Sequence, residues 1–285
     1  MSGEVELKKK TLQIRAAIVG AIACKGGGHI GGSLDLAELF AVLYDNYMNV
    51  DPQNPDWDGR DYLICSKGHA GPVLYASLAL KGFFPYERLK TLNQEGSLLP
   101  GHCDRLKVPG VDATSGSLGQ GLSIACGLAL AAKNKQTNQK VFCVTGDGES
   151  AEGQIWEAAQ FAAHYKLDNL IAFLDWNKMQ IDGSNDQVMA LGDVQAKYKA
   201  FGWNVTMVDG ADVAAIDKAV DEAVKKKNGH PSMIVLDTVK GNGVSCVATM
   251  ENNHCIGFTN DLYLDAKKEI SGQAEQLGVK IEWLK

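Results

Sequence analysis

Residues 141–177 read VFCVTGDGESAEGQIWEAAQFAAHYKLDNLIAFLDWN, and this stretch decides the fold. Two apolar runs, 141–145 and 169–174, flank a polar turn and a helical segment, which is the pattern of strand, crossover helix and strand. Strands joined in this way run parallel, and neighbouring strands lie roughly 4.8 Å apart. Their carboxyl ends therefore meet at one edge of the sheet, which is where open α/β sheets bind ligands.

Both strands end in oxygen-bearing side chains at that edge. Asp147 follows the first strand and Asn177 follows the second, thirty positions later (177 − 147 = 30). A carboxylate and an amide oxygen are hard ligands that suit Mg²⁺, which completes its octahedral shell with water and substrate phosphates. Gly146 and Gly148 flank the aspartate, and glycine lets the backbone approach a phosphate closely. The pattern predicts a magnesium and diphosphate site.

The same turn also fits a dinucleotide-binding fingerprint. Gly146, Gly148 and Ala151 match the loose G-x-G-x-x-G/A pattern between a strand and a helix. Two observations count against this alternative, because Asp147 would place a bare carboxylate beside a pyrophosphate and Asn177 would have no role. A nucleotide-binding module without chemistry of its own is the competing hypothesis.

The composition is that of an ordinary globular protein. The chain has 285 residues, of which 45% are hydrophobic, and a net charge of −6. A net negative charge does not favour binding to nucleic acid or to an anionic membrane. No apolar run approaches the ~18 residues of a membrane span. Seven cysteines include no C-x-x-C pair, and the polar start MSGEVELKKK is not expected to act as a signal peptide. We therefore expect a cytoplasmic protein with reduced thiols.

Alternating strand and helix patterns along the chain predict a three-layer, doubly wound α/β fold with a parallel sheet and helices on both faces. Beyond the 141–175 unit, strands are expected at 62–65, 204–208 and 233–239. Helices are expected over 7–25, 33–47 with Ser33 as N-cap, 72–81, 121–135, 189–200 and 212–227. No linker interrupts the pattern, so residues 1–285 are expected to form a single domain.

Three histidines follow glycine residues in loops at the ends of predicted elements, namely His29, His69 and His102. These ends could all meet at one sheet edge, so we expect a shared site. Imidazole titrates near pH ~6.5 and can exchange protons with sugar hydroxyls. His254 lies in a Gly/Asn-rich loop after the last strand, where a place at the same edge and an exposed position are both open. The remaining two histidines are expected to be structural.

Seven motifs, occurring in order, resemble the N-terminal, diphosphate-binding half of transketolases over roughly residues 10–260. They are GGGHIGGS, SKGHAGPVLY, LPGH, TSGSLGQGL, GDGESAEGQIWEA, DWNKMQIDG and KGNG. The resemblance implies a thiamine diphosphate-binding (PP) domain. It further implies a split transketolase, in which the pyrimidine-binding and C-terminal domains lie on a C-terminal transketolase subunit. The two chains would then form an α2β2 heterotetramer.

The resemblance also implies the site residues. Mg²⁺, or another divalent ion such as Ca²⁺, would be held by Asp147, Asn177 and the backbone carbonyl of Met179. Cofactor-binding positions would be His69, Gly116, Ser117, Leu118, Gly148, Asn177, Ile181 and Lys240. Catalytic positions would be His29, His102, His254 and Glu152. The three histidines would bind donor-sugar hydroxyls and relay protons, and the glutamate would reach across the subunit interface toward the partner's catalytic glutamate.

The implied reaction is transfer of a two-carbon ketol unit from a ketose phosphate to an aldose phosphate, as in pentose phosphate metabolism. Pentose, apiose-type and sulfonated sugars all remain open as donors. The chain departs from the family pattern at Gly32, where many relatives have a hydroxyl, and around His254, where ENNHCIG lacks the usual His-Gly pair. A 2-oxo acid dehydrogenase E1 component and a deoxyxylulose-phosphate synthase are alternatives, but SKGHAGPVLY and TSGSLGQGL favour transketolase.

Overall fold

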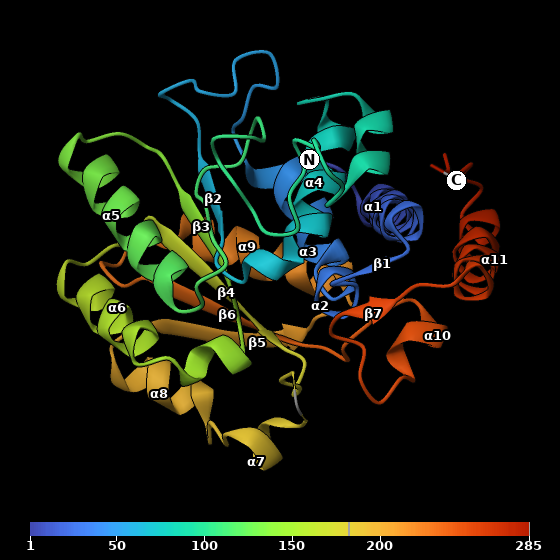
Figure 1. The fold of residues 1–285 in the computed structure, drawn as a ribbon. Coiled ribbons are helices and arrows are strands. Elements are labelled where there is room, and N and C mark those ends of the chain that lie inside the picture. Colours follow the sequence, from blue (N-terminus) through green and yellow to red (C-terminus); the bar gives the residue numbers. More distant parts are fainter. Residues whose placement is uncertain (182, 285) are drawn as a thin grey trace.

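The computed structural model describes residues 1–181 and 183–284. Its centre is a five-stranded parallel sheet with the strand order β2-β3-β4-β6-β5 (Figure 1). The strands are β2 (Tyr62–Cys65), β3 (Val141–Gly146), β4 (Leu170–Trp176), β5 (Asn204–Asp209) and β6 (Ser232–Asp237). The predicted strand, crossover helix and strand over 141–175 is confirmed, because β3 and β4 pair directly and in parallel with Gly146 opposite Asp175.

Helices cover both faces of this sheet. The α-helices are α1 (Glu4–Lys25), α2 (Gly31–Leu34), α3 (Ala37–Val42), α4 (Gly71–Lys81), α5 (Gln120–Asn134), α6 (Gly153–His164), α7 (Asn185–Val188), α8 (Val194–Ala200), α9 (Val213–Lys225), α10 (Ser245–Ala248) and α11 (Asn260–Gln276). Short helices of other types are η1 (Leu43–Tyr47), η2 (Gly68–Ala70), η3 (Tyr86–Thr91) and η4 (Gly148–Ala151). None of the helices within the described ranges combines the length and the apolar character that crossing a membrane requires.

Two hydrophobic cores lie on opposite faces of the sheet. Alternate side chains of each strand point to opposite faces, so Phe142 and Val144 join one core while Val141 and Cys143 join the other. The first core is covered by α1, α3, α4 and α9, and the second by α5, α6 and α8, as Figure 1 shows. Because both faces are buried, the strands read as continuous apolar runs, and the expected three-layer fold is confirmed.

The expected helix over 33–47 was wrong in its start and its continuity. Ser33 lies inside α2 and its hydroxyl donates to the carbonyl of His29, so it does not cap the helix. The helix breaks between α2 and α3, where the Asp35 side chain is drawn into contacts with other loops. The helix expected over 189–200 begins only at Val194, capped by Asp193.

A short antiparallel ribbon that the sequence pattern did not reveal joins the two ends of the fold. Its strands are β1 (Gly27–Gly28) and β7 (Ile256–Gly257). A Cβ on Gly27 would lie 2.6 Å from the carbonyl oxygen of Ile256, so only glycine allows this close approach. The ribbon brings the loop that carries His29 beside the loop that carries His254.

Candidate functional site

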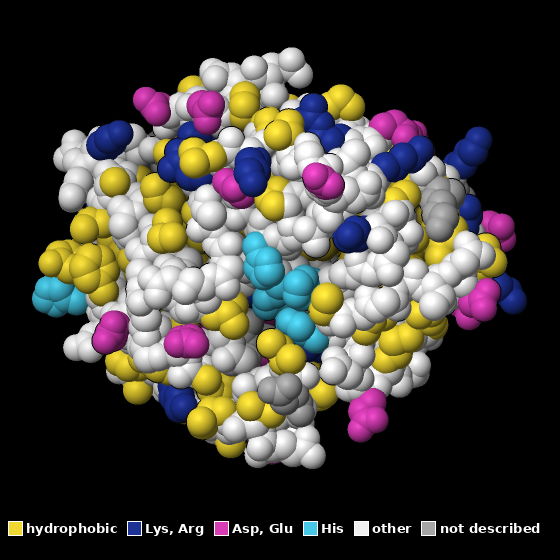
Figure 2. Space-filling model, viewed as in Figure 1, with side chains coloured by type: hydrophobic (Ala, Val, Ile, Leu, Met, Phe, Trp, Pro, Cys, Tyr) yellow, Lys and Arg dark blue, Asp and Glu magenta, His cyan; other side chains and the backbone are white. Residues whose placement is uncertain are grey.

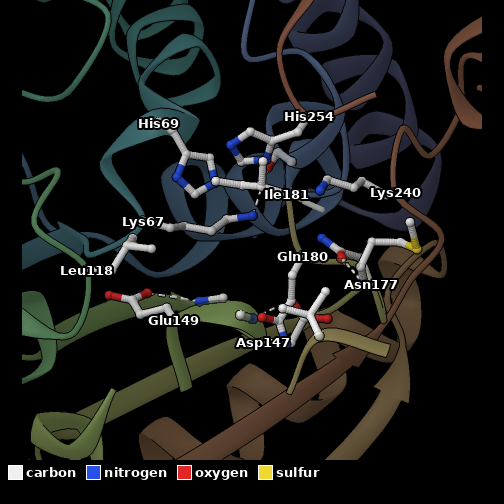
Figure 3. A pocket seen from close by; sticks show the side chains of 15 residues that line it. Lys67, His69, Leu118, Asp147, Glu149, Asn177, Gln180, Ile181, Lys240 and His254 are labelled. Atoms are coloured by element: carbon white, nitrogen blue, oxygen red, sulfur yellow. Dashed lines mark hydrogen bonds between the residues drawn. The ribbon is translucent and has the colours of Figure 1, made fainter. Parts of the chain in front are cut away.

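A cavity of about 210 Å³ opens at the carboxyl ends of β3 and β4, at the edge that the sequence predicts. Figure 2 shows histidine side chains gathered at the centre of this face, and Figure 3 shows the side chains that line the cavity. The lining residues are Gly32, Lys67, His69, Leu118, Gly146, Asp147, Gly148, Glu149, Asn177, Met179, Gln180, Ile181, Val188, Lys240 and His254. Hydrophilic groups and apolar side chains thus share one pocket.

Asp147 follows β3 directly and is held rigidly at the cavity. Its Oδ1 accepts from the backbone N–H of Gly148 at 2.8 Å. Its Oδ2 accepts from the backbone N–H of Lys178 at 2.6 Å and from Nδ2 of Asn185 at 3.0 Å. Burial, and then the charge of Asp175, raises the pKa of Asp147 to about 6. A cation bound at this carboxylate would offset the cost of its buried charge.

Asn177 follows β4 and its amide has a fixed orientation. Nδ2 donates to Oδ2 of Asp35 at 3.0 Å and to Oδ2 of Asp175 at 3.1 Å. The Oδ1 atom lies on the other side of the amide, where it accepts from the backbone N–H of Met179 at 3.0 Å. Asp147 and Asn177 therefore present oxygens from neighbouring strand ends, as hard cations require.

Buried charges around the cavity do not balance. Among the described residues, the buried carboxylates that line the cavity or bond to its lining are Asp35, Asp147, Glu149 and Asp175, and the buried ammonium groups are Lys67 and Lys240. When all are ionised, the set carries two excess negative charges (4 − 2 = 2). Burial raises the pKa of Asp35, Asp147 and Glu149, which marks the cost of keeping these carboxylates charged inside the protein. A divalent cation would neutralise the excess negative charge.

The cavity also has room and positive charge for an anion beside that cation. A Cβ on Gly148 would lie 3.1 Å from Cγ of Gln180, and a Cβ on Gly32 would lie 3.1 Å from Nζ of Lys67. The two glycines therefore keep the space open. Burial, and then the charge of Lys67, lowers the pKa of Lys240. An anion beside Lys240 would offset the cost of its buried charge, and the donor set as a whole fits a magnesium and diphosphate group.

Four histidine rings pack together at the mouth of this site. The ring of His29 lies 5.7 Å from that of His69, 5.3 Å from His102 and 5.2 Å from His254, measured between centroids. The rings of His69 and His254 are 4.7 Å apart. The structure thus brings together the three histidines expected to share a site, and it adds His254, whose position the sequence left open.

Burial lowers the pKa of three histidines in this cluster. Burial, and then the charge of Lys67, lowers the pKa of His69 to about 2. Burial, and then Lys240, lowers the pKa of His254 to about 3, and burial followed by His102 lowers the pKa of His29. A neutral imidazole has one donor and one acceptor nitrogen, so these rings can both accept and donate hydrogen bonds to substrate hydroxyls.

Not every expected site residue lines the cavity. Among the described residues, the expected positions outside its lining are His29, His102, Gly116, Ser117 and Glu152. The two histidines nevertheless belong to the four-ring cluster. Gly116 lies beside this cluster, because a Cβ added to Gly116 would be 3.2 Å from Cδ2 of His102. Glu152 is exposed at the start of α6. It packs against Gly119, because a Cβ added to Gly119 would lie 2.8 Å from Cβ of Glu152.

Sequence reasoning missed two buried ionic residues that line the cavity, Lys67 and Glu149. Lys67 is only 2% exposed and donates to Asp175 and, at 2.9 Å, to the carbonyl of Gly32. Glu149 accepts from Ser66 and from the backbone N–H groups of Gly119 and Gly146 at 2.9 and 3.0 Å. Both residues lie inside motifs that were already identified in the sequence, SKGHAGPVLY and GDGESAEGQIWEA. That position was the available signal. Their burial requires partners, because charged residues are almost never fully buried unless they are paired.

Known proteins share both the sequence and the fold. Residues 7–281 match the family described as transketolase, thiamine diphosphate binding domain. The 6-deoxy-6-sulfo-D-fructose transketolase subunit SqwG of Clostridium sp. (strain MSTE9) is 46% identical over 267 residues, which cover 94% of this chain and 97% of that protein. One of the apulose-4-phosphate transketolase subunits, from Phocaeicola vulgatus, is 38% identical over 88% of each chain.

Solved transketolase structures match this chain over less than half of their own length. A transketolase variant from Pichia stipitis aligns with a TM-score of 0.87 and 34% identity, covering 99% of this chain and 42% of that one. Transketolase from Campylobacter jejuni aligns with a TM-score of 0.87 and 30% identity, and the match covers 98% of this chain and 44% of that one. The similarity therefore extends over almost the whole of this chain and over one part of the longer proteins.

Proposed function

The chain belongs to the transketolase family through its thiamine diphosphate-binding domain, and we propose that it is the cofactor-binding subunit of a split transketolase. Residues 1–285 would form this one domain, while a partner chain would supply the pyrimidine-binding and C-terminal domains in an α2β2 heterotetramer. Two relatives named as transketolase subunits support the proposal, because the match spans 97% and 88% of their lengths.

The observation that carries the proposal is the cavity at the ends of β3 and β4, with its excess of buried carboxylates. Asp147, Asn177 and the carbonyl of Met179 would hold Mg²⁺. The diphosphate would lie against the residues His69, Gly148 and Lys240. Leu118 and Ile181 would flank the cofactor rings, with Gly116 and Ser117 alongside. These positions supply the hard oxygens, the positive charge and the apolar side chains that thiamine diphosphate with Mg²⁺ needs.

When bound, thiamine diphosphate supplies the electron sink for cleaving a carbon–carbon bond of a ketose. The chain's own residues would orient the donor and move protons. The rings of His29, His102 and His254 would bind hydroxyls of the donor sugar and hold the proton released as the bond breaks. Glu152 would act across the subunit boundary. The donor would be a ketose phosphate or a sulfonated ketose, since relatives are named for both classes.

Cofactor binding is expected to depend on pH through Asp147. Its raised pKa, about 6, stabilises the unliganded protein at low pH, and this contribution is lost as pH rises through about 6. Above that pH the ionised carboxylate is free to bind the metal, whereas below it the metal must displace a proton. Thiamine diphosphate with Mg²⁺ should therefore raise the melting temperature of the assembled enzyme more at pH 7.5 than at pH 5.5.

The same thermal-shift series tests the competing hypotheses. NAD should give no stabilisation at either pH, and a shift with NAD but none with thiamine diphosphate and Mg²⁺ would support the nucleotide-binding module. Product analysis then separates the thiamine enzymes from one another. Transfer from a ketose phosphate to an aldose phosphate is the expected reaction, while products formed from pyruvate would favour the dehydrogenase or synthase alternative.

His29→Ala is expected to lower kcat of the assembled enzyme by a factor on the order of 10²–10⁴, the usual contribution of a positioned proton-transfer group. Cofactor affinity should stay near wild type. His29 packs against the rings of His69 and His254, but it is not one of the described residues that line the cavity. Steady-state kinetics and a thiamine diphosphate titration measure the two effects. His164→Ala, on the exposed end of α6, is the matched control and should behave as wild type. An unchanged kcat for His29→Ala would remove this histidine from the mechanism.

A further inference from the structure

We propose that Asp35 is a positioning residue that sets both loops of the candidate cofactor site, an inference that rests on the proposed function. Asp35 is fully buried at the break between α2 and α3. It is not one of the described residues that line the cavity. Its carboxylate nevertheless contacts the loop after β4 and the loop after β6. One side chain thus joins the segment with Asn177 to the segment with Lys240.

The first contact fixes the amide of Asn177. Both hydrogens of Nδ2 point to carboxylates, one to Oδ2 of Asp35 at 3.0 Å and one to Oδ2 of Asp175 at 3.1 Å. Reversing the amide would bring its oxygen against two carboxylate oxygens, which is electrostatically unfavourable. Asp35 therefore keeps Oδ1 of Asn177 on the side away from the carboxylates, in the orientation that a metal ligand needs.

The second contact holds the loop after β6, which carries Lys240. Oδ1 of Asp35 accepts from the backbone N–H of Gly241 at 2.6 Å and from that of Asn242 at 3.3 Å. Gly241 has φ +90°, and a Cβ there would lie 3.0 Å from the backbone of Ala248, so the turn allows little rearrangement. The Lys240 side chain, which lines the cavity, is consequently anchored at its base.

In each of these hydrogen bonds the Asp35 carboxylate is the acceptor. Asp175, on the other side of the Asn177 amide, also accepts from two donors that do not bond to Asp35, namely Lys67 and the Thr238 hydroxyl at 2.8 Å. An amide in place of the Asp35 carboxylate would turn one acceptor into a donor that faces either Gly241 N–H or Asn177 Nδ2. Asp35→Asn should therefore disturb one of the two loops while leaving the volume of the side chain unchanged.

The test measures the dissociation constant of thiamine diphosphate in saturating Mg²⁺ for the assembled enzyme, by quenching of tryptophan fluorescence. Trp176, next to Asn177, is a suitable reporter. Asp35→Asn should weaken binding by roughly 10–100-fold, the usual effect of losing a group that orients a metal ligand. Its unliganded melting temperature should stay near that of wild type, because the lower cost of burying a neutral amide offsets the loss of one acceptor. Thr238→Val, which touches Asp175 but not Asn177, is the control and should keep wild-type affinity.

A purely structural role would give a different result. It would lower the melting temperature of unliganded Asp35→Asn, or prevent its folding, and either outcome overturns the proposal. Wild-type affinity in a folded Asp35→Asn enzyme also overturns it, and leaves the proposed function intact. If the wild-type assembly itself shows no binding of thiamine diphosphate, the proposed function fails, and this inference fails with it.

Discussion

The isolated chain is expected to transfer no ketol group, and to gain this activity only when the chain that carries the remaining transketolase domains is added. Three large apolar side chains are exposed at the cavity: Ile181 and Val188 line it and are 57% and 41% exposed, and Met189, next to Val188 in the chain, is 57% exposed. Clustered apolar side chains on a surface mark an interface. The cofactor cavity is therefore expected to close only when a second polypeptide covers this side of it.

Activity assays of each chain alone and of their mixture measure this dependence. The rate should rise with added partner and reach a plateau at a fixed ratio of the two chains. Met189→Asp is expected to shift that titration to higher partner concentration, because a charge would be buried at the interface. Leu264→Asp changes an equally exposed apolar side chain on α11, at 52% exposure, and serves as the matched control. Full transketolase activity from the purified single chain would refute the split-subunit proposal.

The sequence predicts the centre of this fold because its signals there are local. Both faces of β3 and β4 are buried, so each strand is a continuous apolar run, and the helix between them has a clear apolar face. One crossover of this length then forces parallel pairing. The place of Asp147 and Asn177 at the same edge follows from that pairing alone, before any side-chain contact is known.

The residues that were missed depend on partners far away in the chain. Asp35 contacts Asn177, which is 142 positions later, and Lys67 contacts Asp175, which is 108 positions later. Periodicity describes which face of an element is buried, and it says nothing about which distant charge will meet a buried one. The same limit explains the helix break at Asp35, because a tertiary contact there overrides a helical pattern.

Asp147→Asn is expected to reduce the affinity for thiamine diphosphate with Mg²⁺ by roughly 10²- to 10⁴-fold, and to reduce transfer accordingly. Removing one partner of a buried charge pair costs about 3–5 kcal/mol, and each 1.4 kcal/mol corresponds to a factor of ten. The new amide would also direct a donor at the N–H of either Gly148 or Lys178, since both now donate to the Asp147 carboxylate. The variant therefore loses both the charge and one acceptor at the turn.

The unliganded protein should respond in the opposite direction, which separates binding from folding. Because burial, followed by Asp175, raises the pKa of Asp147 to about 6, the ionised side chain is unfavourable at pH 7.5 and a neutral amide removes that cost. The melting temperature of unliganded Asp147→Asn should therefore equal or exceed that of wild type, while its response to the cofactor disappears. Asp237→Asn, at the end of the neighbouring strand β6, changes a half-exposed aspartate paired with Lys178 and should leave both measurements unchanged. If Asp147→Asn binds the cofactor as wild type does, the metal cannot lie at the end of β3, and the buried carboxylates of this edge require another explanation.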